Sequence, residues 1–438
     1  MVKLLDVLAL VTEQLTISTD LLHDIATRFQ RDMVDGLAGR PSSLKMLPSF
    51  ITSPTGKEHG KVLAIDFGGT NVRVLLVELK GSGKVNIIDR RSVALKDKLG
   101  HYDYTSSEIS GTELFDFIAG KIAEIVPAEG FYPLGHTFSF PCRQYGINEA
   151  ILISWTKEIR TAGVEGENVG QLLQYALKRK GVGHVKPVTV INDTTGTLLA
   201  AAYTEGSTCI GSICGTGHNS CYLEPDHPLT GKTMIVNLES GNFNGIYQTK
   251  YDKLLDQASK QPGAQQLEKM ASGQYLGELV RLIVSGIAAE AHSFQGNGRL
   301  NAPYSLPTED ITPILADMSK ELSAVANVAM VRWGLDNLTW DELMAIKTVA
   351  LLVTVRSARL VAATWVGVLL KIDPGFSQRH TIAVDGSLYE KLPGYAVGLV
   401  NAMIDILGDK AEQVTITLSK DGSGIGAAIA AATAHGMR

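Results

Sequence analysis

Apolar residues recur at helical spacing near the start of the chain. They stand three or four positions apart over residues 15–37, with Gly36 and Gly39 at the end of the run. This spacing predicts an amphipathic helix that ends near one of these glycines. The positions on its apolar face are Leu15, Ile17, Leu21, Leu22, Ile25, Phe29, Met33 and Leu37.

A different pattern covers residues 61–79. Two apolar runs flank the tetrapeptide GGTN (68–71), and the second run is rich in Val and Leu rather than in helix formers. We therefore expect a strand, a tight turn and a second strand. The pattern recurs at 208–224, where two apolar runs flank GTGHN (215–219).

Neither glycine turn has the familiar phosphate-binding sequences GxxxxGK[ST] or GxGxxG, which lead into helices. Consecutive N–H groups in a turn can still bind an anion, and glycine admits it closely. Asp66 could hold Mg²⁺ through water, and Arg73 could reach phosphate oxygens. Residues 68–71 alone favour an ordinary hairpin, but two such turns could face each other across a cleft and hold the β- and γ-phosphates of a nucleotide from both sides.

A carboxylate stands where another apolar run gives way to small residues. The stretch TVINDTTGTLLAA (189–201) predicts a strand that leads into a helix, with Asp193 at the junction. Asp is a preferred N-cap, so capping is one interpretation of Asp193. The other is that Asp193 accepts a proton from a substrate, in which case Thr194 would be the more natural cap.

Composition narrows the class of protein. The chain has 438 residues, 45% of them hydrophobic, which suits two or three globular domains with substantial cores. Its net charge is −5 and it has no long Lys/Arg run. Nucleic acid or an anionic membrane is therefore not expected as the main partner, and a small molecule is.

Two further features of the sequence indicate the cellular compartment of the protein. The apolar stretch 348–370 carries Arg356 and Arg359 in its middle, so we expect a buried helix rather than a membrane span, and a cytoplasmic protein. The cysteines lack zinc-site spacing and are too few for a disulfide framework, so we expect reduced core thiols. They are Cys142, Cys209, Cys214 and Cys221.

Many motifs together resemble the hexokinases, which belong to the actin-like ATPase superfamily. The similarity is to the eukaryotic-type hexokinases and glucokinases, over nearly the whole chain and with a single catalytic unit. The motifs that carry it are DGLAGRPSSLKMLPSF, LAIDFGGTNVRVLLVEL, HTFSFPC, ISWTKEI, VINDTTGTLLAAAY, GTGHNSCYLE, PGAQQLEKMASGQYLGELVRLI, VDGSLYEKLPGY and LSKDGSGIGAA.

The resemblance implies which side chains contact the sugar. A hexose presents several hydroxyls, so amides, carboxylates and a lysine suit its pocket better than an apolar wall. Taken singly, Ser139 could bond its own backbone, and Lys157 or Gln265 could face solvent. The implied sugar contacts are Ser139, Thr156, Lys157, Asn192, Asp193, Asn219, Glu239, Gln265 and Glu268.

The resemblance to the hexokinases also implies how the phosphoryl group is transferred. Asp193 would be the general base for the sugar 6-hydroxyl, and Lys157 would assist the transferring phosphoryl group of Mg-ATP. No side chain is expected to bind the metal directly, because the phosphates hold it, with Asp66 contributing through water. The implied nucleotide contacts are Asp66, Gly68, Gly69, Thr70, Asn71, Arg73, Gly215, Thr216, Gly217, Gly386, Ser387 and Leu388.

The implied architecture is an α/β fold of the actin-like ATPase (ribonuclease H-like) kind, with two lobes around a central cleft. Residues 60–193 plus 422–438 would form the small lobe, and 1–59 plus 194–421 the large lobe. The expected activity is ATP-dependent phosphorylation of glucose, mannose and fructose, the first step of glycolysis, by a monomer or homodimer. Sugar binding would close the cleft and exclude water.

Two positions depart from the family pattern. Ser240 follows Glu239 where the family usually has Trp, and His136 precedes TFSF where Phe is usual. These departures bear on local packing and on sugar selectivity. Two other functions remain open: a catalytically silent sugar sensor, and an actin-like ATPase of assembly or chaperoning, which would not need TFSFPC, SWTK or QQLEK.

Overall fold

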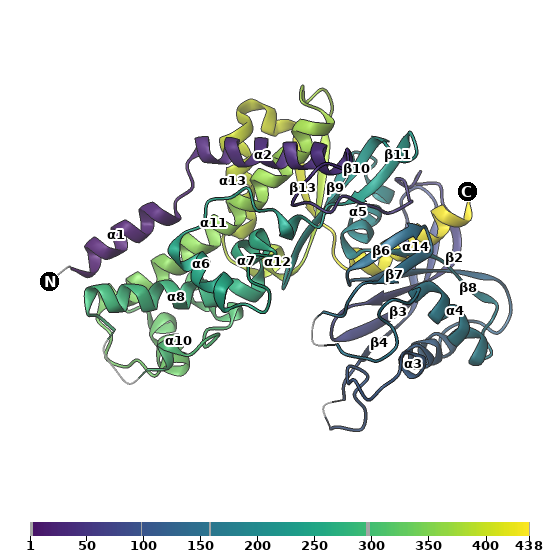
Figure 1. Ribbon diagram of the computed structural model, residues 1–438, viewed down its shortest axis with the longest axis horizontal. Coiled ribbons are helices and arrows are strands. Elements are labelled where there is room, and N and C mark those ends of the chain that lie inside the picture. The colour runs from purple at the N-terminus through teal and green to yellow at the C-terminus, as the bar shows by residue number, and fades with distance from the viewer. Residues whose placement is uncertain (1–2, 98, 157–158, 295–297, 438) are drawn as a thin grey trace.

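The computed structural model describes residues 3–97, 99–156, 159–294 and 298–437. Figure 1 shows helices gathered at the N-terminal end and strands at the other, with the C-terminal helix α14 (Gly422–His435) lying among the strands. Two larger sheets and one two-stranded ribbon, β6 (Cys142–Gly146) with β7 (Glu149–Leu152), make up the β-structure of the described residues.

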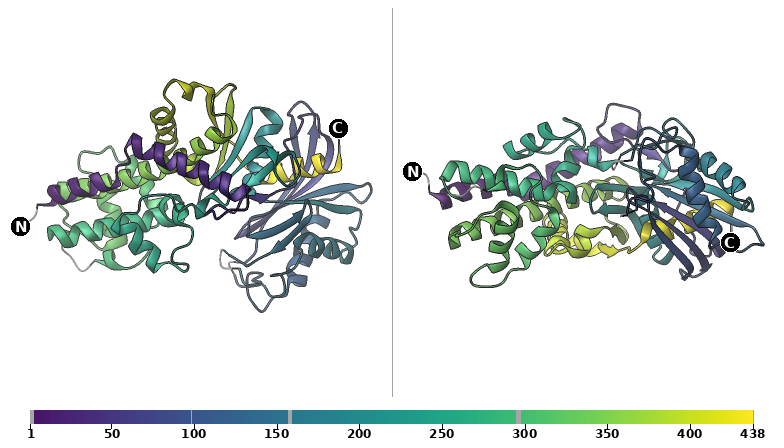
Figure 2. Two further views of the ribbon diagram at one scale, coloured as in Figure 1. Left: turned by 45° about the horizontal axis from the view of Figure 1, so that its top comes forward. Right: turned by 90° about the horizontal axis from the view of Figure 1, so that it is seen from below.

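The first apolar pattern forms two helices rather than one. They are α1 (Leu4–Leu15) and α2 (Thr19–Leu37). The observed helix α2 therefore begins four residues after the predicted start at residue 15. The helix is interrupted before α2 because the backbone of Ser18 is extended. The Ser18 side chain accepts a hydrogen bond from the Leu21 N–H at 3.3 Å, as an N-cap does. The predicted apolar face is correct, and Figure 2 shows these purple helices lying along the green helical part of the chain.

One sheet has the strand order β4-β3-β2-β5-β8. Its strands are β2 (His59–Phe67), β3 (Asn71–Lys80), β4 (Val85–Ala94), β5 (Tyr132–Phe138) and β8 (Val185–Ile191). Strands β2 and β3 are antiparallel and pair Asp66 with Arg73, which confirms the predicted hairpin around the first glycine turn. Helices α3 (Gly111–Ala123) and α4 (Val169–Arg179) share a core with one face, and α14 packs on the other.

The second sheet has the order β1-β11-β10-β9-β12-β13. Its strands are β1 (Leu47–Pro48), β9 (Thr208–Cys214), β10 (His218–His227), β11 (Lys232–Asn237), β12 (His380–Asp385) and β13 (Val414–Leu418). Strands β9 and β10 are antiparallel, so the second glycine turn is also a hairpin, as predicted. Helix α5 (Asp193–Thr204) lies against this sheet.

The remaining helices belong to the helical part of the chain, whose longest member is α11 (Trp340–Ile372). They are α6 (Lys250–Ala258), α7 (Gln266–Ala271), α8 (Gly273–Ala291), α9 (Ile311–Ala316), α10 (Ser323–Trp333), α12 (Ser387–Lys391) and α13 (Tyr395–Leu407). Within the described ranges, α11 is the one helix long and apolar enough to cross a membrane, but 78% of its apolar window is buried inside the protein. Arg356 in its middle forms a bidentate ion pair with Asp252 at 2.7 and 2.8 Å, which explains how a guanidinium is accommodated there.

All four cysteines are free thiols, as predicted. Cys209, Cys214 and Cys221 are buried, whereas Cys142 is only half-buried. Burial raises the pKa of each thiol to about 12, so none is expected as thiolate near neutral pH.

Small residues let α14 pack unusually closely. A Cβ added to Gly135 of β5 would lie 1.9 Å from the carbonyl oxygen of Ala427, and one added to Gly426 would lie 2.0 Å from that of Gly196. The backbones of β5, α14 and α5 therefore touch, and any side chain at these positions would separate them. The glycine- and alanine-rich sequence of α14 supplies these small residues.

The sheets draw on different parts of the chain. The five-stranded sheet uses residues 59–191, and the six-stranded sheet uses 47–48, 208–237 and 380–418. The lobe boundaries between 59 and 60, 193 and 194, and 421 and 422 stay a prediction.

His136 is a polar residue in an aromatic core. Its side chain is fully buried, stacks on Phe67 at 6.5 Å between ring centroids, and contacts Phe138 edge-on at 5.3 Å. Neither ring nitrogen has a hydrogen-bond partner among the described residues. Burial lowers the pKa of His136 to about 3, so the folded protein holds a neutral imidazole.

We expect His136→Phe to stabilise the protein by about 1–3 kcal/mol at pH 7, because it removes two buried nitrogens without partners. Below a pH of about 6.5 only the unfolded wild type takes up a proton at this position, so the wild type loses stability as pH falls toward 3. The advantage of the variant should therefore widen between pH 7 and pH 5, by up to about 1.4 kcal/mol per pH unit.

Urea denaturation at several pH values measures this difference. The exposed His23 provides a control, since His23→Phe makes the same exchange outside the core and should give no comparable gain in stability at pH 7. An advantage of His136→Phe that stays constant from pH 7 to pH 5 would contradict the interpretation.

Candidate active site

The first glycine turn connects β2 to β3 at one end of the five-stranded sheet. The Gly68 N–H donates to the carbonyl of Asn71 at 3.3 Å, and the carbonyl of Thr70 accepts from the Leu95 N–H at 2.9 Å. Thr70 and Asn71 are exposed, and Gly68 and Gly69 are half-buried. The turn therefore presents backbone and small polar groups at the surface, as phosphate binding requires.

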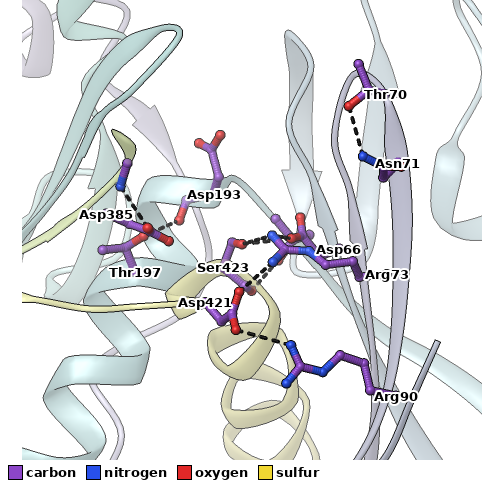
Figure 3. Close-up of polar contacts among 12 residues, drawn as sticks. Asp66, Thr70, Asn71, Arg73, Arg90, Asp193, Thr197, Asp385, Asp421 and Ser423 are labelled. Atoms are coloured by element: carbon purple, nitrogen blue, oxygen red, sulfur yellow. Dashed lines mark hydrogen bonds and ion pairs between the residues drawn. The ribbon is translucent and has the colours of Figure 1, made fainter. Parts of the chain in front are cut away.

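The two charged residues beside this turn bond to each other. Arg73 forms a short ion pair with the buried Asp66 and a second ion pair with Asp421 at 2.7 Å. The Ser423 hydroxyl donates to Asp66 at 2.9 Å, and Arg90 lies 3.3 Å from Asp421. Figure 3 shows that Asp421 and Ser423, from the start of α14, stand between Arg73 on one side and Asp193 and Asp385 on the other.

The second glycine turn is held by backbone hydrogen bonds to α8. The Gly273 N–H donates to the Gly215 carbonyl at 2.8 Å, and the Gln274 N–H donates to the Thr216 carbonyl at 2.9 Å. Gly386 has a φ of +121° and would place a Cβ 2.5 Å from the backbone of Cys214, so only glycine fits there. Two of the three expected nucleotide segments, 215–217 and 386–388, thus lie side by side.

Residues 385–388 differ in what they offer a ligand. Ser387 is exposed, but the Leu388 side chain is part of the large core, so only its backbone is available for contact. The preceding Asp385 accepts a hydrogen bond from the Gly386 N–H at 2.7 Å. Burial raises the pKa of Asp385 to about 6, in spite of that bond and of the nearby Arg73.

Three of the expected sugar residues converge on one polar cluster. The Asn219 amide nitrogen lies 3.5 Å from an oxygen of Glu239 and 3.5 Å from the side-chain oxygen of Asn192. Asn237 joins this cluster, accepting from Asn219 at 2.9 Å and donating to Glu239 at 2.8 Å. Burial raises the pKa of Glu239. Asn192, Asn237 and Glu239 line one small cavity.

The other expected sugar residues have surroundings of their own. Glu268 accepts from the His218 N–H at 3.0 Å, which attaches it to the second turn. Gln265 precedes α7 with a left-handed φ of +52°. The Ser139 N–H donates to the Phe67 carbonyl at 3.2 Å, and Thr156 is half-buried. Lys157 lies outside the described residues.

Asn192, not Thr194, is the cap of helix α5. Asn192 has extended backbone angles, and its side-chain oxygen accepts from the N–H and the hydroxyl of Thr194 at 3.0 and 2.8 Å. The expectation that Thr194 takes the capping role is wrong, because Thr194 already lies within the helix and donates its hydroxyl. Asp193 is therefore the first helical residue, half-buried, with one oxygen 2.9 Å from the Thr194 N–H.

Sequence reasoning missed Asp421, Ser423 and Asp385, which lie beside the expected nucleotide segments, and Asn237, which belongs to the polar cluster. A signal for the first three was present, because the tripeptide Asp-Gly-Ser occurs at both 385–387 and 421–423. Nothing comparable pointed to Asn237, whose role depends on the pairing of β10 with β11.

Fold and site together define a two-lobed α/β protein with paired glycine turns and a polar cluster between its sheets. Two hexokinase family models match the chain, over residues 7–203 and 209–433. The chain belongs to the hexokinase family and has its actin-like ATPase fold.

Individual relatives agree. Hexokinase-1 of Schizosaccharomyces pombe is 36% identical over 96% of this chain and 89% of its own length. Rat hexokinase-2 is 37% identical over 96% of this chain, which spans 47% of that protein. A hexokinase crystal structure superimposes with a TM-score of 0.88 at 33% identity, covering 98% of this chain and 99% of its own. The Schistosoma mansoni hexokinase, complexed with glucose, gives 0.84 at 32% identity, with 98% of each chain covered.

We expect Arg73→Met to lower the free energy of unfolding by about 2–3 kcal/mol, because it leaves the buried Asp66 without its cation. The loss is smaller than for a fully buried pair, since the Arg73 side chain is 34% exposed. Arg90→Met is the matched control: Arg90 pairs with Asp421 from an exposed position, 48% accessible, and the loss of this pair should cost under about 1 kcal/mol. Equal melting temperatures for the two variants in scanning calorimetry would refute this assignment.

Proposed function

We propose that this hexokinase transfers the γ-phosphoryl group of Mg-ATP to the 6-hydroxyl of glucose, and also of mannose and fructose. The glucose complex of the Schistosoma relative supports glucose as a substrate. The polar cluster of Asn192, Asn219 and Glu239 supports the same assignment, because it offers both amides and a carboxylate to sugar hydroxyls.

The position of Asp193 is the observation that carries the mechanism. It directly follows Asn192, which caps the helix, so the Asp193 carboxylate is not needed for capping. Asp193 is half-buried and stands beside the polar cluster, where it contributes to the raised pKa of Glu239. In the proposed mechanism it accepts the proton of the 6-hydroxyl while that oxygen attacks the γ-phosphorus.

Phosphate binding is assigned to the two glycine turns and to Arg73. The N–H groups of Gly68 and Gly215 already donate within their turns, so those proposed for phosphate belong to Gly69, Thr216 and Gly217. The Arg73 guanidinium offers charge. Arg73 keeps its contact with Asp66 while phosphate takes the place of Asp421 as its second partner. Lys157 is proposed to stabilise the transferring phosphoryl group.

Magnesium fits this site when it is carried by the nucleotide. The described residues contain no group of three ligating side chains, so the phosphates would supply most of its ligands. Arg73 and Ser423 both contact the same oxygen of Asp66, which leaves the other oxygen to accept from a metal-bound water. Bound there, the metal would neutralise charge that develops on the phosphates.

The remaining parts of the proposal concern the whole protein. It is proposed to act in the cytoplasm as a monomer or homodimer, in the first step of glycolysis. Binding of the sugar is proposed to bring the lobes of 60–193 plus 422–438 and 1–59 plus 194–421 together, which would exclude water from the phosphoryl group.

A coupled assay of ADP formation tests the chemistry. We expect turnover that requires a hexose, and a kcat about 10²-fold or more lower in Asp193→Asn, a change that keeps the shape of the side chain but removes the base. Asp116→Asn, which alters a remote ion pair with Arg179, should retain wild-type kcat.

The outcomes separate the competing functions. Wild-type ATP hydrolysis that is independent of hexose would favour an actin-like ATPase. Glucose binding without turnover would favour a silent sensor. An unchanged kcat in Asp193→Asn would refute the role of Asp193 as base and leave membership of the family untouched.

Lobe closure has its own test. We expect saturating glucose to reduce the radius of gyration in small-angle X-ray scattering, because the two sheets approach each other across the site. The same measurement with a hexose that fails to support turnover is the control. An identical scattering curve with and without glucose would contradict closure.

A further inference from the structure

His218 lies between the second glycine turn and the polar cluster that contains Asn219 and Glu239. It is the first residue of β10, directly after Gly217, and its side chain is buried. Its backbone N–H donates to Glu268 at 3.0 Å. Gly241 packs against the same place, because a Cβ there would lie 3.0 Å from both the His218 carbonyl oxygen and the Glu268 Cβ.

The imidazole of His218 has one protonation arrangement that satisfies its neighbours. Nδ1 lies 3.1 Å from the carbonyl oxygen of Ile213, which can only accept, so Nδ1 carries the proton. Burial lowers the pKa of His218 to about 4, so the ring is neutral and Nε2 is an acceptor. Nε2 lies 3.4 Å from the Ser240 hydroxyl, which must therefore be the donor.

Ser240 connects His218 to the polar cluster. It begins the short 3₁₀ helix η1 (Ser240–Asn242), and its N–H donates to the side-chain oxygen of Asn219 at 3.1 Å. The Ser220 N–H donates to that same oxygen at 2.7 Å. With the oxygen fixed by two donors, the Asn219 nitrogen must face Glu239 and Asn192.

The backbone of Glu239 also depends on this arrangement. Glu239 has a left-handed φ of +52°, an uncommon conformation for a residue other than glycine. Ser240, its neighbour, is fully buried and held by His218 on its side chain and by Asn219 on its N–H. Surrounding contacts of this kind are what maintain such a conformation.

We propose that His218 and Ser240 act together as positioning residues, which hold Glu239, Asn219 and Glu268 in place for the sugar and attach them to the second phosphate turn. The inference rests on the proposed function, since these three residues are its sugar ligands. Neither His218 nor Ser240 touches the sugar, so their effect is on sugar affinity through the residues they orient.

Ser240→Ala is the mildest test, because it removes one hydroxyl from a buried site and leaves the backbone. We expect the Kd for glucose, measured by calorimetry, to rise about 10-fold, with KM for ATP within about twofold of wild type. Thr364→Val is the matched control: it removes an equally buried hydroxyl, bonded to the Val361 carbonyl at 2.7 Å within α11, and keeps the shape of the side chain. The Kd of this control for glucose should stay within about twofold of wild type, even where its melting temperature falls by as much as that of Ser240→Ala.

A double-mutant cycle tests whether the pair acts as a unit. His218→Phe keeps a ring of similar size without nitrogens and should also weaken glucose binding about 10-fold. The double variant should remain near 10-fold rather than reach about 100-fold, because either change alone breaks the contact. If His218→Phe does not fold, Ser240→Ala with its control still decides the question.

The results distinguish this inference from the function beneath it. A wild type that fails to bind glucose refutes the proposed function. A wild type that binds glucose, together with a Ser240→Ala variant of unchanged Kd, overturns the positioning role and leaves the proposed function standing. Independent effects in the cycle would overturn the claim that the two residues act together.

Discussion

The close contact of α14 with α5 and β5 is the constraint on which the rest of the structure depends. Glycines at 135, 196 and 426 let three backbones touch, and a single Cβ at any of them would overlap a neighbouring main chain. One face of the five-stranded sheet, α14 and α5 therefore share a core that also reaches Ile235 of β11 in the other sheet. The relative position of the two sheets is set by small residues rather than by large complementary side chains.

This contact also fixes the polar groups at the helix ends. Helix α14 starts with Ser423 within its first turn and Asp421 at its cap, and both bond to the Asp66–Arg73 pair. Helix α5 starts with Asp193. Because the helices cross at Gly196 and Gly426, near their N-terminal ends, the proposed phosphate-binding arginine and the proposed base are positioned by one helix pair.

What the sequence predicted well was local. The two hairpins follow from apolar runs around glycine turns, and the buried face of α2 follows from its period. The break at Ser18 was missed because the apolar spacing continues across it, and the choice of Asn192 over Thr194 as cap depends on backbone angles that composition does not encode. The Arg73–Asp421 pair joins residues far apart in the chain, so no local pattern predicts it. The family resemblance supplied the sugar residues, which singly looked like ordinary surface polar groups.

The balance of charge at the proposed phosphate site favours a nucleotide that carries a metal ion. Asp66, Asp193, Asp385 and Asp421 gather near Arg73 and Arg90, so carboxylates outnumber guanidinium groups where phosphate is proposed to bind. A bare triphosphate would be repelled there, whereas one that carries its own divalent cation would not. Burial raises the pKa of Asp385 to about 6, which still leaves that carboxyl mostly ionised near pH 7, so it adds to the negative charge that the cation offsets. The proposed nucleotide side thus suits a metal–phosphate complex. The proposed sugar side instead offers the half-buried carboxylates of Asp193, Glu239 and Glu268 together with side-chain amides, which suits hydrogen bonding to hydroxyls.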